Sequence, residues 1–270
     1  MSQPEMWAIV LAGQRDGEDE LAAHAAASCK AFVEIHGKLM LWRVLEALSS
    51  SRRIGPILLS GPDEEKLKRQ SEFLQLLQAI GVRWSPPRES PSASTYDSLC
   101  RVPPEAPVLV TTADHPLLSA GIIDEFCTRS AGLDADLVVG LAPHSLVRAE
   151  FPEMRKTVLR FRGIPLCGCN LFAFMTREGR EAADYWRRVE SGRKKPLRLI
   201  GSLGWWNLAR YVLGRLALDD ALAALSSELG LRIGAVILQH ADAAVDVDSV
   251  SDFRLVDARF RQRADDRRPV

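Results

Sequence analysis

The sequence lacks three features that would place it in a specialised class of protein. No run of about 18 apolar residues occurs, which excludes a membrane-spanning helix. Its 35 basic residues are balanced by 35 acidic ones, whereas proteins that wrap nucleic acid are usually strongly basic. Residues 1–7 contain no basic segment that leads into a long apolar one, so we expect no signal peptide. These absences predict a cytoplasmic protein with neither a nucleic-acid partner nor a membrane span.

Cysteine is also scarce. The five cysteines are an odd number and are mostly scattered: Cys29, Cys100, Cys127, Cys167 and Cys169. This usage is typical of reduced thiols rather than of a disulfide framework. Cys167 and Cys169 are close in sequence, but no two further ligands follow at a zinc-binding spacing. We interpret this pair as buried residues of a strand.

What is present is the composition of a folded globule, with 47% hydrophobic and 26% charged residues. Short apolar runs rich in β-branched residues alternate with stretches of helical spacing through the first two-thirds of the chain. This order predicts an α/β fold: a three-layer, Rossmann-like, mostly parallel mixed sheet with helices on both faces. We expect a single domain over 1–270, with a helical insertion over about 177–229.

The expected elements can be placed along the chain. Strands are predicted at 7–12, 32–35, 54–60, 82–84, 107–112, 136–141, 158–161, 169–174, 234–238 and 244–247. Helices are predicted at 39–48, 63–80, 95–101, 118–130 and 249–260, and the serine- and proline-rich stretch 85–94 is predicted as a loop.

Polar residues follow three of the predicted strands. Gly13-Gln14-Arg15 follows the first strand, Asp114 follows the strand at 107–112, and Asp248 follows the last one. In an open α/β sheet, ligands bind outside the carboxyl ends of the strands. We therefore expect these residues to converge on one crevice.

Four segments, in this order, resemble the motifs of the MobA-like nucleotidyltransferases. The opening Leu11-Ala12-Gly13-Gln14-Arg15, with Lys30 and Gly37-Lys38-Leu39-Met40 after it, is similar to the start of that family. Asp114-His115-Pro116-Leu117 resembles its Asp-x-Pro-Leu motif. Gly168-Cys169-Asn170 resembles the Gly-x-Asn segment that faces the acceptor. Val245-Asp246-Val247-Asp248-Ser249-Val250-Ser251-Asp252 resembles the family's late Asp-x-Asp-Thr-Pro-x-Asp motif. The matches extend from residue 7 to about residue 256.

The resemblance implies a GT-A-type sheet and a nucleotidyltransferase of the EC 2.7.7 type. Such an enzyme moves a nucleoside monophosphate group from a nucleoside triphosphate to a phosphorylated small molecule and releases pyrophosphate, with Mg²⁺ as cofactor. The reaction develops negative charge on phosphate oxygens, so it needs cations and backbone N–H groups more than a base.

The resemblance also implies roles for particular residues. Asp114 and Asp248 would hold Mg²⁺, with Asp246 as a further ligand, because this hard cation prefers carboxylate oxygens. Arg15 and Lys30 would neutralise the triphosphate and, with Asp114, form the catalytic set. The remaining nucleotide-binding residues would be Leu11, Ala12, Gly13 and Gln14, where Gly13 allows the backbone to approach the phosphates.

Other residues are expected to recognise the base and the acceptor. The hydroxyl groups of Ser92 and Ser94 would bond to a base edge or ribose, although serine and proline also simply make good loops. Arg160 and Arg162, which alternate along a predicted strand, would bind the acceptor together with Asn170.

The first loop departs from the family pattern. It has few glycines and four acids, namely Asp16, Glu18, Asp19 and Glu20, which repel a triphosphate unless they point outward or share the metal. We expect residues 14–29 to be mobile without ligand and to become ordered with Mg²⁺ and the triphosphate. The loop leaves open a non-catalytic nucleotide-binding protein, and the shared fold leaves open a glycosyltransferase that uses a nucleotide-sugar. The sequence identifies neither the base nor the acceptor, and it leaves a homodimer open.

Overall fold

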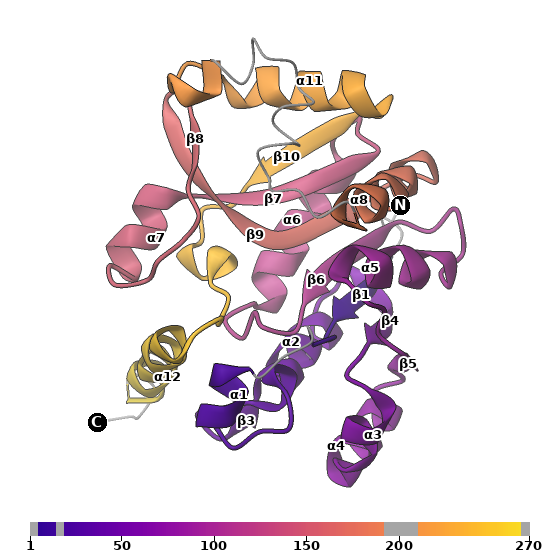
Figure 1. The fold of residues 1–270 in the computed structure, drawn as a ribbon, viewed down its shortest axis with the longest axis vertical. Helices are drawn as coiled ribbons and strands as arrows, with labels where there is room; N and C mark the ends of the chain where they lie inside the picture. The colour runs from indigo at the N-terminus through magenta and orange to yellow at the C-terminus, as the bar shows by residue number, and fades with distance from the viewer. Residues whose placement is uncertain (1–4, 15–18, 192–209, 266–270) are drawn as a thin grey trace.

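The computed structural model describes residues 5–14, 19–191 and 210–265. In these ranges the chain forms an eight-stranded sheet covered by helices, and a separate two-stranded hairpin (Figure 1). The strand order is β10-β7-β9-β6-β1-β4-β5, and β8 pairs with β9. β9 is antiparallel to β6, β7 and β8, whereas β1 is parallel to β4 and β6, β4 to β5, and β7 to β10. The expected mixed, mostly parallel sheet is confirmed.

The strands follow the apolar runs of the sequence. They are β1 Met6–Leu11, β4 Ile54–Ser60, β5 Arg83–Ser85, β6 Val108–Thr112, β7 Leu137–Pro143, β8 Leu159–Phe161, β9 Ile164–Phe174 and β10 Ile233–Ile237, and the hairpin is β2 Glu34–Ile35 with β3 Lys38–Leu39. Residues Ala8, Ile9 and Val10 of β1 are fully buried, as expected for a central strand covered on both faces.

The helices have the bounds α1 Glu20–His24, α2 Met40–Ser49, α3 Glu64–Lys68, α4 Ser71–Ala79, α5 Pro91–Cys100, α6 Ala120–Ala131, α7 His144–Glu150, α8 Glu181–Ser191, α11 Leu218–Leu229 and α12 Val250–Asp265. The described part of the chain also contains the 3₁₀ helices η1 Lys30–Phe32, η2 Glu178–Arg180 and η3 Ala241–Ala244. None of the helices in the described ranges is long and apolar enough to cross a membrane.

Two hydrophobic cores lie on opposite faces of the sheet. Ala8 and Val10 of β1 pack in one core with α2, α4 and α6, whereas Ile9 packs in the other core with α5 and α8. This division follows from the alternation of side chains along a strand. The expected three layers are therefore confirmed.

A third core joins the beginning of the chain to its end. Leu21 of α1, Ile35 of β2 and Met40 of α2 pack with Val247 and with Val256 of α12. Figure 1 shows α12 beside α1 and the β2–β3 hairpin, although these elements are far apart in the sequence. This core brings the residues around Asp248 close to those around Lys30.

Three predicted elements were wrong in detail. Residues 244–247 do not form a strand, because η3 ends at Ala244 and the residues between it and α12 pair with no strand of the described ranges. Asp248 therefore follows an irregular segment. The predicted helix over 63–80 is divided into α3 and α4. α5 begins at Pro91, capped by the Ser90 hydroxyl, which accepts from the Ala93 backbone N–H.

The region of the predicted insertion, 177–229, contains η2, α8 and α11 among its described residues. Residues 192–209 lie outside the described ranges. The division of the chain into domains stays a prediction.

Candidate functional site

The ends of four strands meet at one edge of the sheet. The backbone N–H of Ala12 donates to the Ser60 carbonyl at 2.8 Å, and that of Ala113 donates to the Leu11 carbonyl at 2.9 Å. Gly61 in turn donates to the Ser85 carbonyl at 2.9 Å. The residues that follow β1, β4, β5 and β6 therefore lie side by side, where a ligand site is expected in an open sheet.

The backbone at Gly13 is closely packed between two neighbouring loops. A Cβ atom on Gly61, whose φ is +84°, would lie 2.8 Å from the Gly13 nitrogen. A Cβ atom on Gly13 would lie 3.1 Å from the Cβ of Pro87. The two glycines therefore let the first loop and the loop after β4 approach each other without side chains between them.

Lys30 joins two of the predicted metal-binding carboxylates. Its Nζ donates to Oδ2 of Asp114 at 2.6 Å and to Oδ1 of Asp248. The Thr112 hydroxyl donates to the other oxygen of Asp114 at 2.5 Å. The backbone N–H of Val247 also donates to the Asp114 carbonyl at 2.9 Å. Three predicted site residues from distant parts of the sequence thus contact one another.

The charges of this group stabilise one another. Burial acts to raise the pKa of Asp114, but the Lys30 ammonium and the Thr112 hydroxyl outweigh it and hold that pKa below its usual value. Burial acts to lower the pKa of Lys30, yet Asp114 and Asp248 hold it above its usual value. Lys30 is therefore a protonated cation between two carboxylates.

Asp114 and Asp248 fit the ligand preference of Mg²⁺. Their oxygens converge, because both contact the same ammonium nitrogen. No group of three or more His, Cys, Asp or Glu residues that could hold a metal occurs in the described ranges. Two carboxylates suffice for Mg²⁺, which usually takes its remaining ligands from water and substrate phosphates.

Asp246 belongs to a different group. It forms an ion pair with Lys156, and its Oδ2 accepts from Nδ2 of Asn170 at 3.1 Å. Asn170 has a positive φ of 50°, at the register shift between β7 and β9, and such a shift can redirect a side chain. The prediction that Asp246 shares the metal site is thus not supported by its contacts: the structure pairs it with the predicted acceptor residue Asn170.

Lys66 of α3 is a cation that the sequence analysis did not select. Its Nζ donates to Oε1 of Gln14 at 2.6 Å and lies 3.6 Å from a carboxylate oxygen of Asp63. Its position after β4, a strand parallel to β1, was a signal that could have identified it, because the ends of adjacent parallel strands meet at one edge. Arg15, the predicted cation of this loop, lies outside the described residues.

The predicted base-reading serines have different positions. Ser94 is buried, and its hydroxyl accepts from the Arg88 backbone N–H at 2.9 Å. It therefore holds the loop before α5 in place, and its expected contact with a nucleotide stays a prediction. Ser92 is only partly buried, and its hydroxyl lies 3.1 Å from that of Ser90.

The predicted acceptor arginines lie on β8 and in the turn after it, near the segment that leads into α11. Arg160 is exposed on β8, and Arg162 is exposed in the turn after it, where its backbone N–H donates to the Leu216 carbonyl just before α11. Figure 1 shows α11 at the opposite end of the molecule from α12. The structure therefore does not bring these two arginines to the Asp114–Lys30–Asp248 group.

The second half of the first loop is packed. Asp19 caps α1 by accepting from the Ala22 backbone N–H at 3.0 Å, and Leu21 and Cys29 are buried. Residues 19–29 are therefore anchored by packing and by a helix cap, and the expected mobility of residues 14–29 without ligand stays a prediction. Two of its four acids, Asp19 and Glu20, lie in the described ranges, and Asp19 has this capping role. Residues 15–18 lie outside those ranges.

Comparisons with known proteins concern the family and the fold of the chain. The sequence matches none of the curated proteins with which it was compared. It is similar in structure to a hypothetical transferase from Thermus thermophilus, with 30% identity and a TM-score of 0.77 over 92% of this chain and 99% of that one.

Two more distant structures share the fold. A CMP:2-keto-3-deoxy-manno-octonic acid synthetase in complex with CTP is 14% identical, with a TM-score of 0.60 over 95% of this chain and 99% of that one. A 4-diphosphocytidyl-2C-methyl-D-erythritol synthase from Anaerococcus prevotii is 12% identical, with a TM-score of 0.55 over the same shares. The MobA-like NTP transferase domain matches residues 8–232, which is most of the chain. The chain therefore belongs to the MobA-like NTP transferase domain family.

Proposed function

We propose that this protein transfers a nucleoside monophosphate group from a nucleoside triphosphate to a phosphorylated small molecule, with release of pyrophosphate and with Mg²⁺ as cofactor. The observation that carries the proposal is the contact of Asp114 and Asp248 with Lys30 at the edge of the sheet where β1 and β6 end. Family membership and the fold shared with a synthetase solved with CTP support it.

The residues of the site suit this reaction. Asp114 and Asp248 would hold Mg²⁺, which supplies positive charge to the phosphates when it is bound. Lys30 and Lys66 bring further positive charge to the edge, and the N–H groups near Gly13 can approach phosphate oxygens. An acceptor phosphate oxygen forms a bond to the α-phosphorus while the bond to the pyrophosphate oxygen breaks. The acceptor phosphate is already nucleophilic, so no general base is required.

The first experiment is a binding screen. The midpoint of thermal unfolding is measured with each of the four nucleoside triphosphates, with and without Mg²⁺, because a ligand that binds the native state raises its stability. We expect one triphosphate with Mg²⁺ to raise the midpoint. Nucleotide-sugars are screened in the same way, and a shift with these alone would instead support the glycosyltransferase. A shift with no Mg²⁺ dependence would contradict the metal assignment.

The second experiment tests turnover. Pyrophosphate release is measured with that triphosphate and a panel of sugar and polyol phosphates. Asp114→Asn and Asp248→Asn should each lower the rate by about a hundredfold or more, since each removes a negative ligand of the cation. The control Asp219→Asn removes the same charge from an exposed residue of α11 and should change the rate less than twofold. Near-normal turnover of Asp114→Asn would contradict the assignment, and triphosphate binding without release for any acceptor would favour a non-catalytic protein.

A further inference from the structure

A small cavity lies beside α7, outside the Asp114–Lys30–Asp248 group. Its volume is about 240 Å³. The lining residues are His144, Val147, Arg148, Pro152, Met154 and Lys156. Three of these carry nitrogen groups that can donate hydrogen bonds, three are apolar, and none carries a carboxylate. A cavity with this lining favours an anion attached to a small carbon skeleton.

The two permanent cations of the cavity differ in how they are held. The Lys156 side chain is only 10% exposed and forms an ion pair with Asp246. An ammonium group has three donors, so this pair leaves donors for a ligand. Arg148 is exposed and forms no ion pair with any residue in the described ranges. Its planar guanidinium can therefore bind a phosphate or carboxylate through two parallel hydrogen bonds.

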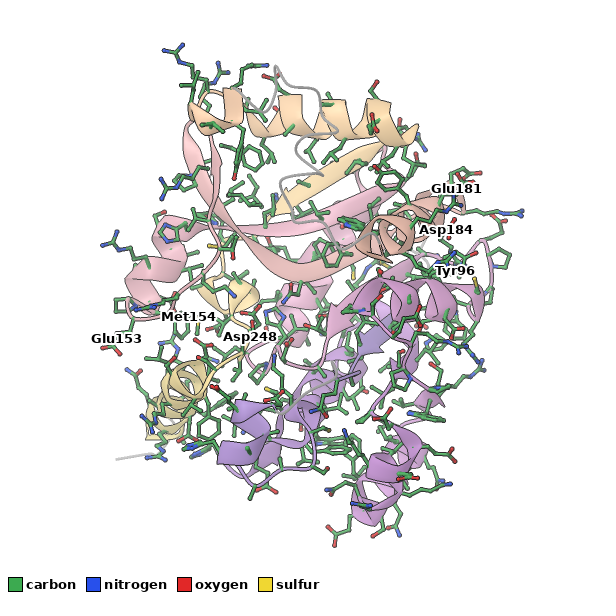
Figure 2. All side chains as sticks on the ribbon, in the orientation of Figure 1. Tyr96, Glu153, Met154, Glu181, Asp184 and Asp248 are labelled. Carbon is green, nitrogen blue, oxygen red and sulfur yellow. The ribbon has the colours of Figure 1, made fainter. Side chains whose placement is uncertain are left out.

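The cavity is connected to the proposed reaction site by direct contacts. Lys156 contacts Asp246, which accepts from Asn170, the residue expected to face the acceptor. The next residue after Asp246, Val247, donates its backbone N–H to the Asp114 carbonyl. In Figure 2 Met154, from the cavity lining, and Asp248, just before α12, lie on the same side of the molecule. A molecule in the cavity would therefore contact Lys156, whose partner Asp246 lies two residues before Asp248.

We propose that this cavity binds an anionic group of the acceptor, a phosphate or a carboxylate, through Arg148, His144 and Lys156. The description of the ligand as the acceptor rests on the proposed function. The apolar residues Val147, Pro152 and Met154 line the part of the cavity that contacts the carbon skeleton. This assignment moves acceptor recognition from Arg160 and Arg162 to Arg148 and Lys156.

The test is a calorimetric titration of the nucleotide-free protein with three probes. Glycerol 1-phosphate and glycerate distinguish a phosphate from a carboxylate, and inorganic pyrophosphate reports on the triphosphate site. Whichever of glycerol 1-phosphate and glycerate binds the wild type more tightly, Arg148→Glu should lower the affinity for it at least tenfold. The same variant should change the affinity for pyrophosphate less than twofold. Arg155→Glu, which makes the same charge change at an exposed residue outside the lining, should leave all three affinities within twofold.

The outcomes separate this proposal from the proposed function. Equal weakening by Arg148→Glu and Arg155→Glu, equal weakening of all three probes, or no binding of either small anion to the wild type would overturn the cavity assignment. None of these results depends on turnover. If no triphosphate binds but Arg148→Glu alone abolishes anion binding, the proposed function fails and the anion site stands. His144→Gln, which removes the imidazole, should weaken binding of the preferred anion more than threefold with an unchanged unfolding midpoint, and an unchanged affinity would remove His144 from the site.

Discussion

Lys30 and Lys66 carry the same charge at the same edge of the sheet, but their partners differ. Lys30 is held between two carboxylates, Asp114 and Asp248, whereas the nearest contact of Lys66 is the neutral amide oxygen of Gln14 at 2.6 Å. The Lys66 carboxylate partner, Asp63, is farther away, at 3.6 Å. The Lys66 ammonium is therefore the less neutralised of the two, which suits it to bind a phosphate.

We predict that Lys66→Ala weakens the binding of pyrophosphate and of the preferred triphosphate about tenfold, because a charge-assisted hydrogen bond contributes about 1.5 kcal/mol or more. Lys68→Ala is the matched control, since Lys68 lies on the same helix but is exposed and pairs with Glu64 at 2.7 Å. Calorimetric titration measures both variants. Equal affinities of Lys66→Ala and Lys68→Ala would show that Lys66 does not contact the phosphates.

Among the helices, α12 connects the segment around Lys30 with the segment that contains Asp248. Val256 is fully buried in the third core, together with Leu21 of α1. The rings of His24 and Phe253 lie 6.2 Å apart in a T-shaped arrangement. The backbone N–H of His36 donates to Asp257 at 3.1 Å. α12 thus holds α1 and the β2–β3 hairpin, which flank Lys30, against the segment that contains Asp248.

Val256→Ala should lower the free energy of unfolding by about 2 kcal/mol, since it removes two buried methyl groups and leaves a cavity. Because α1 packs on α12, amide exchange should accelerate in residues 20–24 as well as in α12. Arg254→Ala, on the exposed side of the same helix, should change the unfolding free energy by less than about 0.5 kcal/mol. Faster exchange in α12 alone would show that α1 is held by other contacts.

For the molecule as a whole, the pH dependence of stability should reflect the carboxylate of Asp136. Its oxygens accept from Nη2 of Arg232 at 2.6 Å, from the Arg232 backbone N–H at 2.9 Å and from the Thr176 hydroxyl at 2.9 Å. The hydrogen bonds from Arg232 hold the pKa of Asp136 far below its usual value. These contacts join the beginning of β7 to the end of β9 and to the residue before β10.

We predict that Asp136→Asn lowers the free energy of unfolding by about 2 kcal/mol at pH 7, the size of a hydrogen bond to a charged group. Because the folded pKa is depressed, this stabilisation is complete above the unfolded pKa of about 3.9 and is lost as the pH falls below it. Urea unfolding at pH 7 and near pH 3 should therefore show a smaller difference between variant and wild type at the lower pH. Asp134→Asn, whose exposed carboxylate also pairs with Arg232, should cost less than about 1 kcal/mol. A difference that is equal at both pH values would contradict the assignment.

The sequence by itself determined the three-layer α/β fold, the family and the positions of Gly13 and Asp114. These depend on local patterns: apolar runs form strands, and polar residues that follow parallel strands meet at one edge. The bounds of β1, β4 and β6 lie within about two residues of those predicted from such runs. The exception at 244–247 is not local, because this apolar run has the pattern of a strand but no strand in the described ranges lies beside it to pair with.

Only the tertiary structure decided which carboxylate has which partner. Asp246 and Asp248 are two residues apart, yet one pairs with Lys156 and the other with Lys30. Tertiary packing likewise buried Ser94, brought Lys66 to Gln14 and directed Asn170 to Asp246. These contacts depend on where α3, β9 and α12 lie around the sheet. Packing of distant apolar faces sets that arrangement, and no local pattern of residues specifies it.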